Sequence, residues 1–461
     1  MTIGPGTRVH FLGVGGIGVS GLARLCAARG LQVSGCDIKL SGAAKLLEQH
    51  GAALASGHHP GHLDVPVDLV VYSAAVPRSE PELMLAEERG IPMMTRGQLL
   101  AALTSDRRLV AVAGAHGKTT TSGLAAELLL HAGWDPTVMV GGVMVSRGTN
   151  AIPGQGTYFV AETDESDGSF LYLAPEIAIV TNIDREHLNH YTSFERLLQA
   201  FQQFASQIRP DGTVIRCVDD PLVRRHIHGP RHLDYGLLDP SAYVRGEQVV
   251  LTGDGSTFRV VYRGRPLGVF ELQVPGRHNV LNALSVIGLG LTLELPLATI
   301  RAALAGYQGT RRRFQVTRLP DDIWLVEDYA HHPSEIQATL AADTHDERRR
   351  LVVFQPHRYS RTQSLEQEFT HCFERADGVI VTDIYSAFET PIPGVSGERL
   401  AELMKAHGHP CVRYIPKQGL HTFITRMMCS GDTIFFLGAG DIGELCHELA
   451  TELRPAVGAA R

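Results

Sequence analysis

Gly114-Ala115-His116-Gly117-Lys118-Thr119-Thr120 follows an apolar run at Leu109–Ala113 and opens a helical pattern over Lys118–Ala132. A buried strand, a glycine turn and a helix in this order are typical of a phosphate-binding loop, because glycines let backbone N–H groups converge on phosphate oxygens at a helix N-terminus. We expect Lys118 to reach the β- and γ-phosphates of a nucleotide and the Thr119 hydroxyl to bind Mg²⁺. The loop is shorter than the GxxxxGK[ST] form, so a chance GKT sequence is the alternative interpretation.

Two acidic segments supply what a metal–nucleotide site would need. Glu162-Thr163-Asp164-Glu165-Ser166-Asp167 follows a strand that ends near Val160, and Asn182-Ile183-Asp184-Arg185-Glu186-His187 follows a strand at Glu176–Thr181. The carboxyl ends of parallel strands share one edge of a sheet, so we expect both segments to face the phosphate loop. Each segment alone would more often be a solvated turn, but carboxylate, hydroxyl and imidazole groups together suit a divalent metal.

The chain as a whole falls into three blocks of α/β pattern, and several domains are expected for 461 residues. The first alternates strands and helices, at Arg8–Leu12, Ile17–Arg29, Leu31–Asp37, Asp68–Tyr72 and Gln98–Leu103. The second holds the phosphate loop, a β-hairpin layer over Tyr243–Val274 with turns at Gly253-Asp254-Gly255 and Arg263-Gly264, and a helix at Asn279–Leu291. The third begins near Arg311, with strands at Ile323–Glu327, Leu351–Phe354, Gly378–Thr382 and Thr433–Phe436. This rhythm predicts parallel sheets covered by helices.

The first block contains a second glycine-rich turn, Gly13-Val14-Gly15-Gly16-Ile17-Gly18, with Asp37 at the end of the next strand. This pattern fits the dinucleotide fingerprint, in which a pyrophosphate lies on a helix N-terminus and the acid meets a ribose hydroxyl. A lone GxGxxG does not say whose pyrophosphate is bound. A nicotinamide-dependent oxidoreductase would explain this block and leave the ATP-type loop of the second unexplained.

Composition excludes some classes of protein. The formal net charge is -7, whereas a general nucleic-acid binder is usually basic. No stretch approaches the roughly 20 apolar residues that span a bilayer, and the first residues lack the basic and apolar pattern of a secretory leader. The seven cysteines show no CxxC spacing. We therefore expect a cytoplasmic enzyme with reduced thiols and without membrane insertion.

The order of these motifs resembles the Mur ligase family of peptidoglycan synthesis and cell-wall biogenesis. The resemblance covers nearly the whole chain and rests on GVGGIGVSGLA from Gly13, GAHGKTTT from Gly114, AETDESD from Ala161, TNIDREH from Thr181 and PGRHNVLNA from Pro275. In the third block, RRFQ from Arg312, EDYAHHP from Glu327 and FQPHRYSRT from Phe354 point to the member that joins L-alanine to UDP-N-acetylmuramate. One departure is Ala115, where many relatives carry threonine; we expect little effect because the loop backbone does most of the phosphate binding.

The resemblance implies an α/β fold of three domains: a Rossmann-like UDP-sugar-binding domain (1–106), a central P-loop ATPase-type domain with the hairpin layer (107–309) and a Rossmann-like amino-acid-binding domain (310–461). It also implies an activity: the muramoyl carboxylate attacks the γ-phosphate of ATP, and the neutral amine of alanine attacks the resulting acyl phosphate. The implied partners are the small molecules UDP-N-acetylmuramate, L-alanine and ATP, with Mg²⁺ or Mn²⁺ and no nucleic acid. We expect a monomer or a homodimer.

The resemblance assigns roles to individual residues. ATP binding is assigned to Gly114, Ala115, His116, Gly117, Lys118, Thr119, Thr120, Asn279 and Asn282, and metal binding to Thr119, Glu162 and His187. The catalytic set is Lys118 and His187 with Arg313 and Asp328, which come from the third domain and close over ATP. The UDP sugar is assigned to Gly15, Gly16, Gly18, Asp37 and Ser73. Alanine is assigned to Tyr329, His331 and Arg358, whose guanidinium suits a carboxylate; a structural cluster at a strand end is the alternative for these three.

Three other functions stay open. A related ligase that reattaches recycled tripeptide to UDP-N-acetylmuramate shares the first substrate and differs in the amino-substrate pocket. The other two are the oxidoreductase above and a non-catalytic nucleotide switch, which would not need the alanine-pocket residues. Several later members of the family carry a carbamylated lysine some fifteen residues beyond the histidine that matches His187. Here the predicted helix Thr192–Arg209 contains no lysine, and Gln202 or Gln203 falls near that position.

Overall fold

The computed structural model describes residues 3–453, without the side chains of residues 188 and 189. Contacts divide the chain into two compact units. Unit 1 comprises the chain up to Gln248 with Phe258–Glu271 and Asn279–Gln308; unit 2 comprises Val249–Thr257, Leu272–His278 and the chain from Gly309. Three sheets run through these units, and most of their paired strands are parallel. The predicted α/β class is confirmed.

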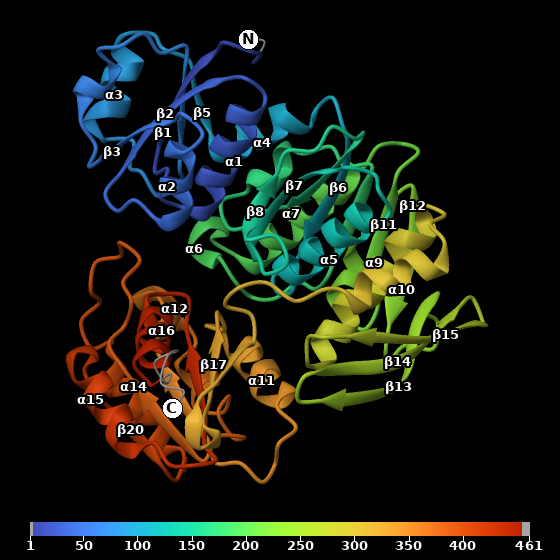
Figure 1. The fold of residues 1–461 in the computed structure, drawn as a ribbon, viewed down its shortest axis with the longest axis vertical. Helices are drawn as coiled ribbons and strands as arrows, with labels where there is room; N and C mark the ends of the chain where they lie inside the picture. Colours follow the sequence, from blue (N-terminus) through green and yellow to red (C-terminus); the bar gives the residue numbers. More distant parts are fainter. Residues whose placement is uncertain (1–2, 454–461) are drawn as a thin grey trace, which may run out of the picture. The chain divides into compact units, whose positions relative to one another are not determined.

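The N-terminal sheet has the order β3-β2-β1-β4-β5 and is parallel throughout. Its strands are β1 (Arg8–Leu12), β2 (Gln32–Asp37), β3 (Ala53–Ser56), β4 (Leu69–Tyr72) and β5 (Met93–Thr95). One face packs on α1 (Ile17–Ala28), α2 (Gly42–Glu48) and α4 (Arg96–Thr104); the other packs on the 3-10 turn η1 (Pro60–Leu63) and α3 (Pro81–Glu88). Figure 1 shows α3 on the opposite side of the sheet from α1. The strand order reverses between β1 and β4, where open α/β sheets bind ligands.

The central sheet has ten strands in the order β15-β14-β13-β12-β11-β10-β6-β9-β7-β8. They are β6 (Arg108–Ala113), β7 (Thr137–Met144), β8 (Thr149–Ile152), β9 (Tyr158–Glu162), β10 (Ile177–Val180), β11 (Thr213–Cys217), β12 (Arg231–Gly236), β13 (Val244–Thr252), β14 (Gly255–Tyr262) and β15 (Arg265–Leu272). The strands β13, β14 and β15 are joined by two-residue connections. They form the predicted hairpin layer, with turns where the glycines predicted them.

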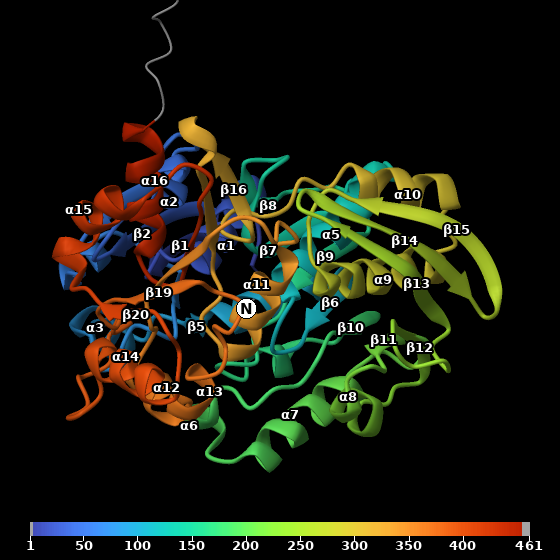
Figure 2. The same cartoon turned by 90° about the horizontal axis from the view of Figure 1, so that it is seen from below.

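Helices cover both faces of this sheet. They are α5 (Lys118–His131), the 3-10 turn η2 (Ser169–Tyr172), α6 (Leu188–Tyr191), α7 (Phe194–Ser206), α8 (Pro221–His226), α9 (Arg277–Thr292) and α10 (Leu297–Ala305). Figure 2 shows α7 and α8 on one side of β10 and β11, and α5, α9 and α10 on the other. The prediction that a helix begins at Thr192 is wrong. Thr192 has a φ of +61°, and the Ser193 hydroxyl accepts the Arg196 N–H as an N-cap.

The C-terminal sheet has the order β16-β17-β21-β18-β19-β20. Its strands are β16 (Gln315–Arg318), β17 (Trp324–Asp328), β18 (Arg350–Phe354), β19 (Gly378–Val381), β20 (Val412–Tyr414) and β21 (Thr433–Leu437), with β16 antiparallel at the edge. One face packs on α11 (Pro333–Ala342), α13 (Glu366–Phe369) and α14 (Gly397–Ala406), the other on α15 (Lys417–Met427) and α16 (Ile442–Glu452). The remaining elements are α12 (Tyr359–Ser364) and η3 (Pro320–Asp322).

Two further expectations concern the whole chain. Within residues 3–453, no helix combines the length and the apolar character needed to cross a membrane. All seven cysteines are free, as the absence of paired spacing predicted.

Candidate active site

The phosphate loop leaves β6 and enters α5 through a left-handed residue. Gly117 is the N-cap of α5, with a φ of +80°, and a Cβ atom at this position would lie 2.6 Å from Oδ1 of Asn282. Both the backbone conformation and the close approach of α9 therefore require glycine at 117. The predicted strand–turn–helix arrangement is confirmed.

Two backbone N–H groups of the phosphate loop are hydrogen-bonded to Asn182, the residue that follows Thr181 after β10. The Ala115 N–H donates to the Asn182 carbonyl (3.1 Å), and the His116 N–H donates to the Asn182 side-chain oxygen (2.8 Å). The first helical bond of α5 runs from the Thr121 N–H to the Gly117 carbonyl, so the N–H groups of residues 118–120 precede it. The bonds to Asn182 thus fix the loop at Ala115 and His116, and the N–H groups of residues 118–120 lie at the N-terminus of α5, where helices commonly bind anions.

Lys118 is held between the loop and an acidic side chain. Its Nζ donates to the carbonyls of Gly114 (2.6 Å) and Ala115 (3.1 Å) and lies 2.6 Å from Oε1 of Glu165. Burial disfavours the charged amine, but the Glu165 carboxylate outweighs that effect and raises the pKa of Lys118. The lysine is therefore a fixed cation at the start of the helix.

Thr119 and Glu162 lie together, as the resemblance implied. Glu162 is the last residue of β9, so the acidic segment begins on the strand. Its carboxylate accepts hydrogen bonds from the Thr119 hydroxyl (3.0 Å), the Ser122 hydroxyl (3.2 Å) and the Gly141 N–H (2.6 Å). These two residues offer oxygen ligands beside the phosphate loop, which suits a hard cation.

His187 lies next to a different carboxylate. Its Nε2 atom is 3.4 Å from Oε1 of Glu165 and 3.6 Å from Oε2 of Glu186, and one ligand atom from each of the three residues falls within 4.8 Å of the others. Oε2 of Glu165 is buried without a hydrogen-bond partner. The arrangement fits a divalent cation, and it adds Glu165 and Glu186 to the residues that the sequence singled out. Their positions in the two acidic segments were the only signal.

Asn279 and Asn282 are buried on the first turns of α9. The Asn282 amide donates to Oδ1 of Asn279 (3.2 Å), and Asn282 lies against Gly117. The structure thus brings this pair to the phosphate loop, although the two residues are about 160 positions further along the chain.

The glycine-rich turn of the N-terminal domain is closed by Asp37. Its carboxylate accepts the Gly15 N–H (2.8 Å) through Oδ2 and the Lys39 N–H (3.0 Å) through Oδ1, so in this structure Asp37 braces the loop in which a ribose contact was expected. Ser73 follows β4, and a Cβ atom at Gly13 would lie 2.8 Å from its Cβ. Gly15, Gly16 and Gly18 therefore lie at the switch point of the sheet, near Asp37 and Ser73.

Arg96 connects this turn to the acidic segment, and no sequence motif indicated that role. A Cβ atom at Gly18 would be 3.2 Å from Cδ of Arg96, and Nη2 of Arg96 is 2.7 Å from Oδ2 of Asp164 and 3.6 Å from Oδ2 of Asp167. Burial acts to raise the pKa of Asp164, but Arg96 and the Ser166 hydroxyl lower it to about 2. The two glycine-rich sites of unit 1 are thus joined through one ion-pair cluster.

In unit 2, Asp328 ends β17 and organises the backbone around it. Its carboxylate accepts the N–H groups of Phe314 (2.7 Å) and Ala330 (2.7 Å). Burial raises the pKa of Asp328 to about 6, although the Arg313 guanidinium acts to lower it. Arg313 lies 5.0 Å from the centre of the Tyr329 ring and 3.8 Å from Glu335.

His331 and Arg358 lie at the carboxyl ends of β17 and β18. The rings of His331 and His357 are 5.5 Å apart, and His331 Nδ1 lies 3.0 Å from the Tyr329 carbonyl. Arg358 follows His357 with a φ of +70°, and its Nε is buried without a hydrogen-bond partner. Strain and an unused donor at one residue are typical of a binding site. The structure thus brings Tyr329, His331 and Arg358 to the same edge of the C-terminal sheet, where β17 and β18 end.

Models of known protein families match each of the three parts of the chain. Three models match in order: "Mur ligase family, catalytic domain" over residues 8–108, "Mur ligase middle domain" over 112–290 and "Mur ligase, glutamate ligase domain" over 312–440. The chain belongs to the Mur ligase family. The resemblance drawn from the sequence motifs and the expected three-domain α/β fold are both confirmed.

Several Mur ligases similar to this chain share a name. A UDP-N-acetylmuramate–L-alanine ligase of Sorangium cellulosum is 44% identical over 97% of this chain and 96% of its own length, and one from Syntrophotalea carbinolica is 42% identical over 97% and 98%. The crystal structure of the UDP-N-acetylmuramate–alanine ligase of Thermotoga maritima has a TM-score of 0.84 at 29% identity and covers 96% of this chain and 98% of its own. A murein peptide ligase of Psychrobacter arcticus, at 24% identity and a TM-score of 0.73, shares the fold.

Proposed function

We propose that this Mur ligase joins L-alanine to UDP-N-acetylmuramate. It uses the phosphate loop of unit 1 together with Tyr329, His331 and Arg358 of unit 2. The activity is an ATP-dependent ligation in the synthesis of peptidoglycan precursors. The observation that carries the assignment is a charged Lys118, fixed between the phosphate loop and Glu165, in a chain similar along nearly its full length to ligases of that name.

The chemistry requires that two anions meet. The lactyl carboxylate of the sugar nucleotide and the γ-phosphate of ATP repel each other, so the site must neutralise the charge that develops as the acyl phosphate forms. Lys118 supplies one positive charge, held at the start of α5 by two backbone carbonyls and the Glu165 carboxylate. Thr119, Glu162, Glu165 and His187 would hold a divalent cation, Mg²⁺ or Mn²⁺, which would supply the remaining charge.

The amino substrate is assigned to unit 2. Alanine carries a carboxylate, and a guanidinium with a free donor is the side chain best suited to bind it. Arg358 has that free Nε donor, and Tyr329 and His331 lie at the same edge of the sheet. We assign the alanine carboxylate to Arg358, with Tyr329 and His331 beside it.

The sugar nucleotide is assigned to the switch point of the N-terminal sheet. A pyrophosphate would meet the start of α1 at Gly15, Gly16 and Gly18, which is favourable for an anion. Asp37 and Ser73 flank that turn. We retain 1–106, 107–309 and 310–461 as the proposed limits of the UDP-sugar, ATP and amino-acid domains.

A phosphate-release assay from which one substrate at a time is omitted tests the assignment. We expect release only when UDP-N-acetylmuramate, ATP and L-alanine are all present, and much less when the tripeptide of recycled peptidoglycan replaces alanine. A preference for the tripeptide would identify the recycling ligase. Calorimetry with NADH should show no binding at concentrations that saturate with the sugar nucleotide, whereas tight NADH binding would contradict the assignment of the first domain.

A further inference from the structure

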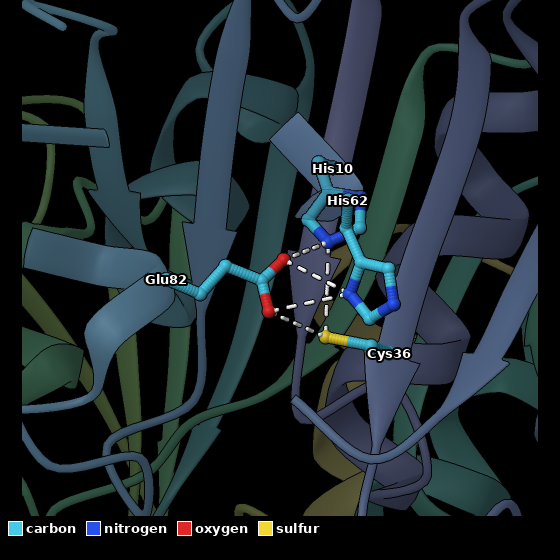
Figure 3. Close-up of side chains that lie close together, drawn as sticks. All are labelled: His10, Cys36, His62 and Glu82. Carbon is cyan, nitrogen blue, oxygen red and sulfur yellow. Dashed lines mark hydrogen bonds and ion pairs between the residues drawn. The ribbon is translucent and has the colours of Figure 1, made fainter. Parts of the chain in front are cut away.

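Four side chains able to bind a metal converge inside the N-terminal domain, on the face of its sheet that η1 and α3 cover. Figure 3 shows His10, Cys36, His62 and Glu82 pointing toward one another. His10 lies on β1 and Cys36 on β2. They share one sheet face, because His10 pairs with Ser34, two residues before Cys36 on the same strand. His62 comes from η1 and Glu82 from α3, the two elements that cover that face.

The separations between their polar atoms are close to those of ligands that share one ion. His10 Nε2 lies 2.7 Å from Glu82 Oε1 and 3.7 Å from Cys36 Sγ. His62 Nδ1 lies 3.3 Å from Glu82 Oε1, and Cys36 Sγ lies 3.3 Å from Glu82 Oε2. One ligand atom from each of the four residues lies within 4.8 Å of the others. Tetrahedral zinc with its usual bond lengths places N, O and S ligands about 3.3–3.6 Å apart, so small side-chain rotations would suffice.

Burial makes this cluster costly without a cation. The Glu82 and Cys36 residues are 0% exposed and His10 is 2% exposed, in a small core formed with residues such as Leu63, Val70 and Leu83. Oε1 of Glu82 lies 2.7 Å from Nε2 of His10 and 3.3 Å from Nδ1 of His62, so two imidazoles face the same buried carboxylate oxygen. A buried carboxylate needs a compensating positive charge, which a protonated imidazole or a bound metal ion can provide; a thiolate beside it adds negative charge and increases that need.

We propose that His10, Cys36, His62 and Glu82 form a zinc site. A thiolate and two imidazoles select zinc over Mg²⁺ or Ca²⁺, which prefer oxygen ligands. Four protein ligands without an open position are typical of a structural site rather than a catalytic one. The ion joins β1, β2, η1 and α3, and so fixes the strand end that carries Asp37.

Two neighbouring histidines orient the ligands. Nδ1 of His58 lies 3.1 Å from the Cys36 sulfur, and the His59 N–H donates to Oε2 of Glu82 (3.1 Å). Outer contacts of this kind fix the orientation of ligating side chains in metal sites. Because the His59 N–H bonds to Oε2, Oε1 is the Glu82 oxygen left to bind the proposed ion.

Cobalt titration of the full chain tests the proposal, because Co²⁺ bound to a thiolate gives a charge-transfer band that oxygen and nitrogen ligands do not. The chain is first stripped with a chelator and then titrated in excess Mg-ATP, which occupies the divalent site at the phosphate loop. We expect a thiolate–cobalt band that saturates at one equivalent and disappears when Zn²⁺ is added. A titration of the wild-type chain without such a band would overturn the proposal.

Two variants locate the site. Cys36→Ser should abolish the band, whereas the control Cys26→Ser, which alters another buried thiol of the same domain, should keep it. Zn²⁺ should raise the unfolding temperature of the wild type and of Cys26→Ser by on the order of 5 °C, and should leave Glu82→Gln nearly unchanged. A band that survives in Cys36→Ser, or an equal thermal shift in Glu82→Gln, would show that the four side chains form a hydrogen-bonded network only.

Discussion

Lys118 is held in place by groups of the protein. A flexible exposed lysine would lose side-chain entropy on meeting the phosphates, whereas this one is already fixed by two carbonyls and a carboxylate. Positive charge that is in place at the start of the reaction needs no reorganisation, which is how preorganised electrostatics accelerates a chemical step. Its contribution should therefore appear in the rate of acyl-phosphate formation.

Replacing this charge should stop ligation while leaving the sugar nucleotide bound. We expect Lys118→Met to lower kcat by at least about 10²-fold and to leave the affinity for UDP-N-acetylmuramate within a few-fold, measured by phosphate release and calorimetry. The variant should also be less stable, because Glu165 loses its partner. Lys45→Met, at an exposed position of α2, is the control. Ligation within tenfold of wild type would remove Lys118 from the catalytic set.

Asp328 should make stability fall as pH rises. Burial raises its pKa from 3.8 to about 6, so between these values the folded protein keeps a proton that the unfolded chain has released. The stability from this group is therefore present below about pH 4 and is lost through pH 6, by at most about 3 kcal/mol. The free energy of unfolding of wild type minus that of Asp328→Asn should decline over that interval in denaturant titrations. Parallel profiles for the two proteins would contradict the shift.

At the scale of elements, the sequence predicted best where a periodic run meets a glycine turn. β1, β6, α1 and α5 lie within a residue or so of their predicted limits, because apolar strands and glycine turns are local signals. The strand β7 escaped prediction, since Gly141-Gly142 interrupts its apolar run and its pairing with β8 shifts register. The edge strand β16 is short and half-exposed, so it carries almost no hydrophobic signal.

In the candidate site, too, only features with a local sequence signal could be predicted. Motif residues such as Lys118 and Thr119 could be predicted, but their partners could not. Nothing local distinguishes Glu165 from the other acids of its segment, and the path of the backbone after β9 decides which one meets Lys118. The bond from Asn182 to the His116 N–H likewise depends on two strands being neighbours. Tertiary hydrogen bonds of this kind are set by the fold rather than by spacing.

The helix α7 covers the position at which several later members of the family carry a carbamylated lysine. It contains no lysine, and Gln202, fifteen positions beyond His187, places its amide 3.3 Å from Nδ1 of His226. A neutral amide cannot be carbamylated and offers one weak oxygen where a carbamate would offer two charged ones.

Activity should therefore not depend on dissolved carbon dioxide. We expect the same phosphate-release rate in buffers purged of carbon dioxide and in buffers with added bicarbonate, with Gln202→Ala as active as wild type. A purged enzyme that loses activity and regains it with bicarbonate would show that another residue is carbamylated.

Over the whole molecule, the groups that we assign to different substrates are carried by different parts of the chain. The phosphate loop and the glycine-rich turn belong to unit 1, and Tyr329, His331 and Arg358 belong to unit 2. The two glycine-rich sites share the Arg96 cluster, so changes at one are expected to reach the other. A change at Arg358 does not touch that cluster. The binding of alanine should therefore be separable from the binding of the sugar nucleotide.

Arg358→Ala tests this separation. Losing a charge-assisted hydrogen bond costs about 1.5–3 kcal/mol, which corresponds to a rise in KM for alanine of roughly 10- to 100-fold. The calorimetric affinity for UDP-N-acetylmuramate should stay within a few-fold, because its assigned residues lie in unit 1. Arg399→Ala, which removes a half-exposed guanidinium paired with Glu366 on the same unit, should change neither quantity. If KM for alanine and the affinity for the sugar nucleotide worsen together while the fold is intact, Arg358 acts on the whole molecule, and the alanine carboxylate must be bound by another residue.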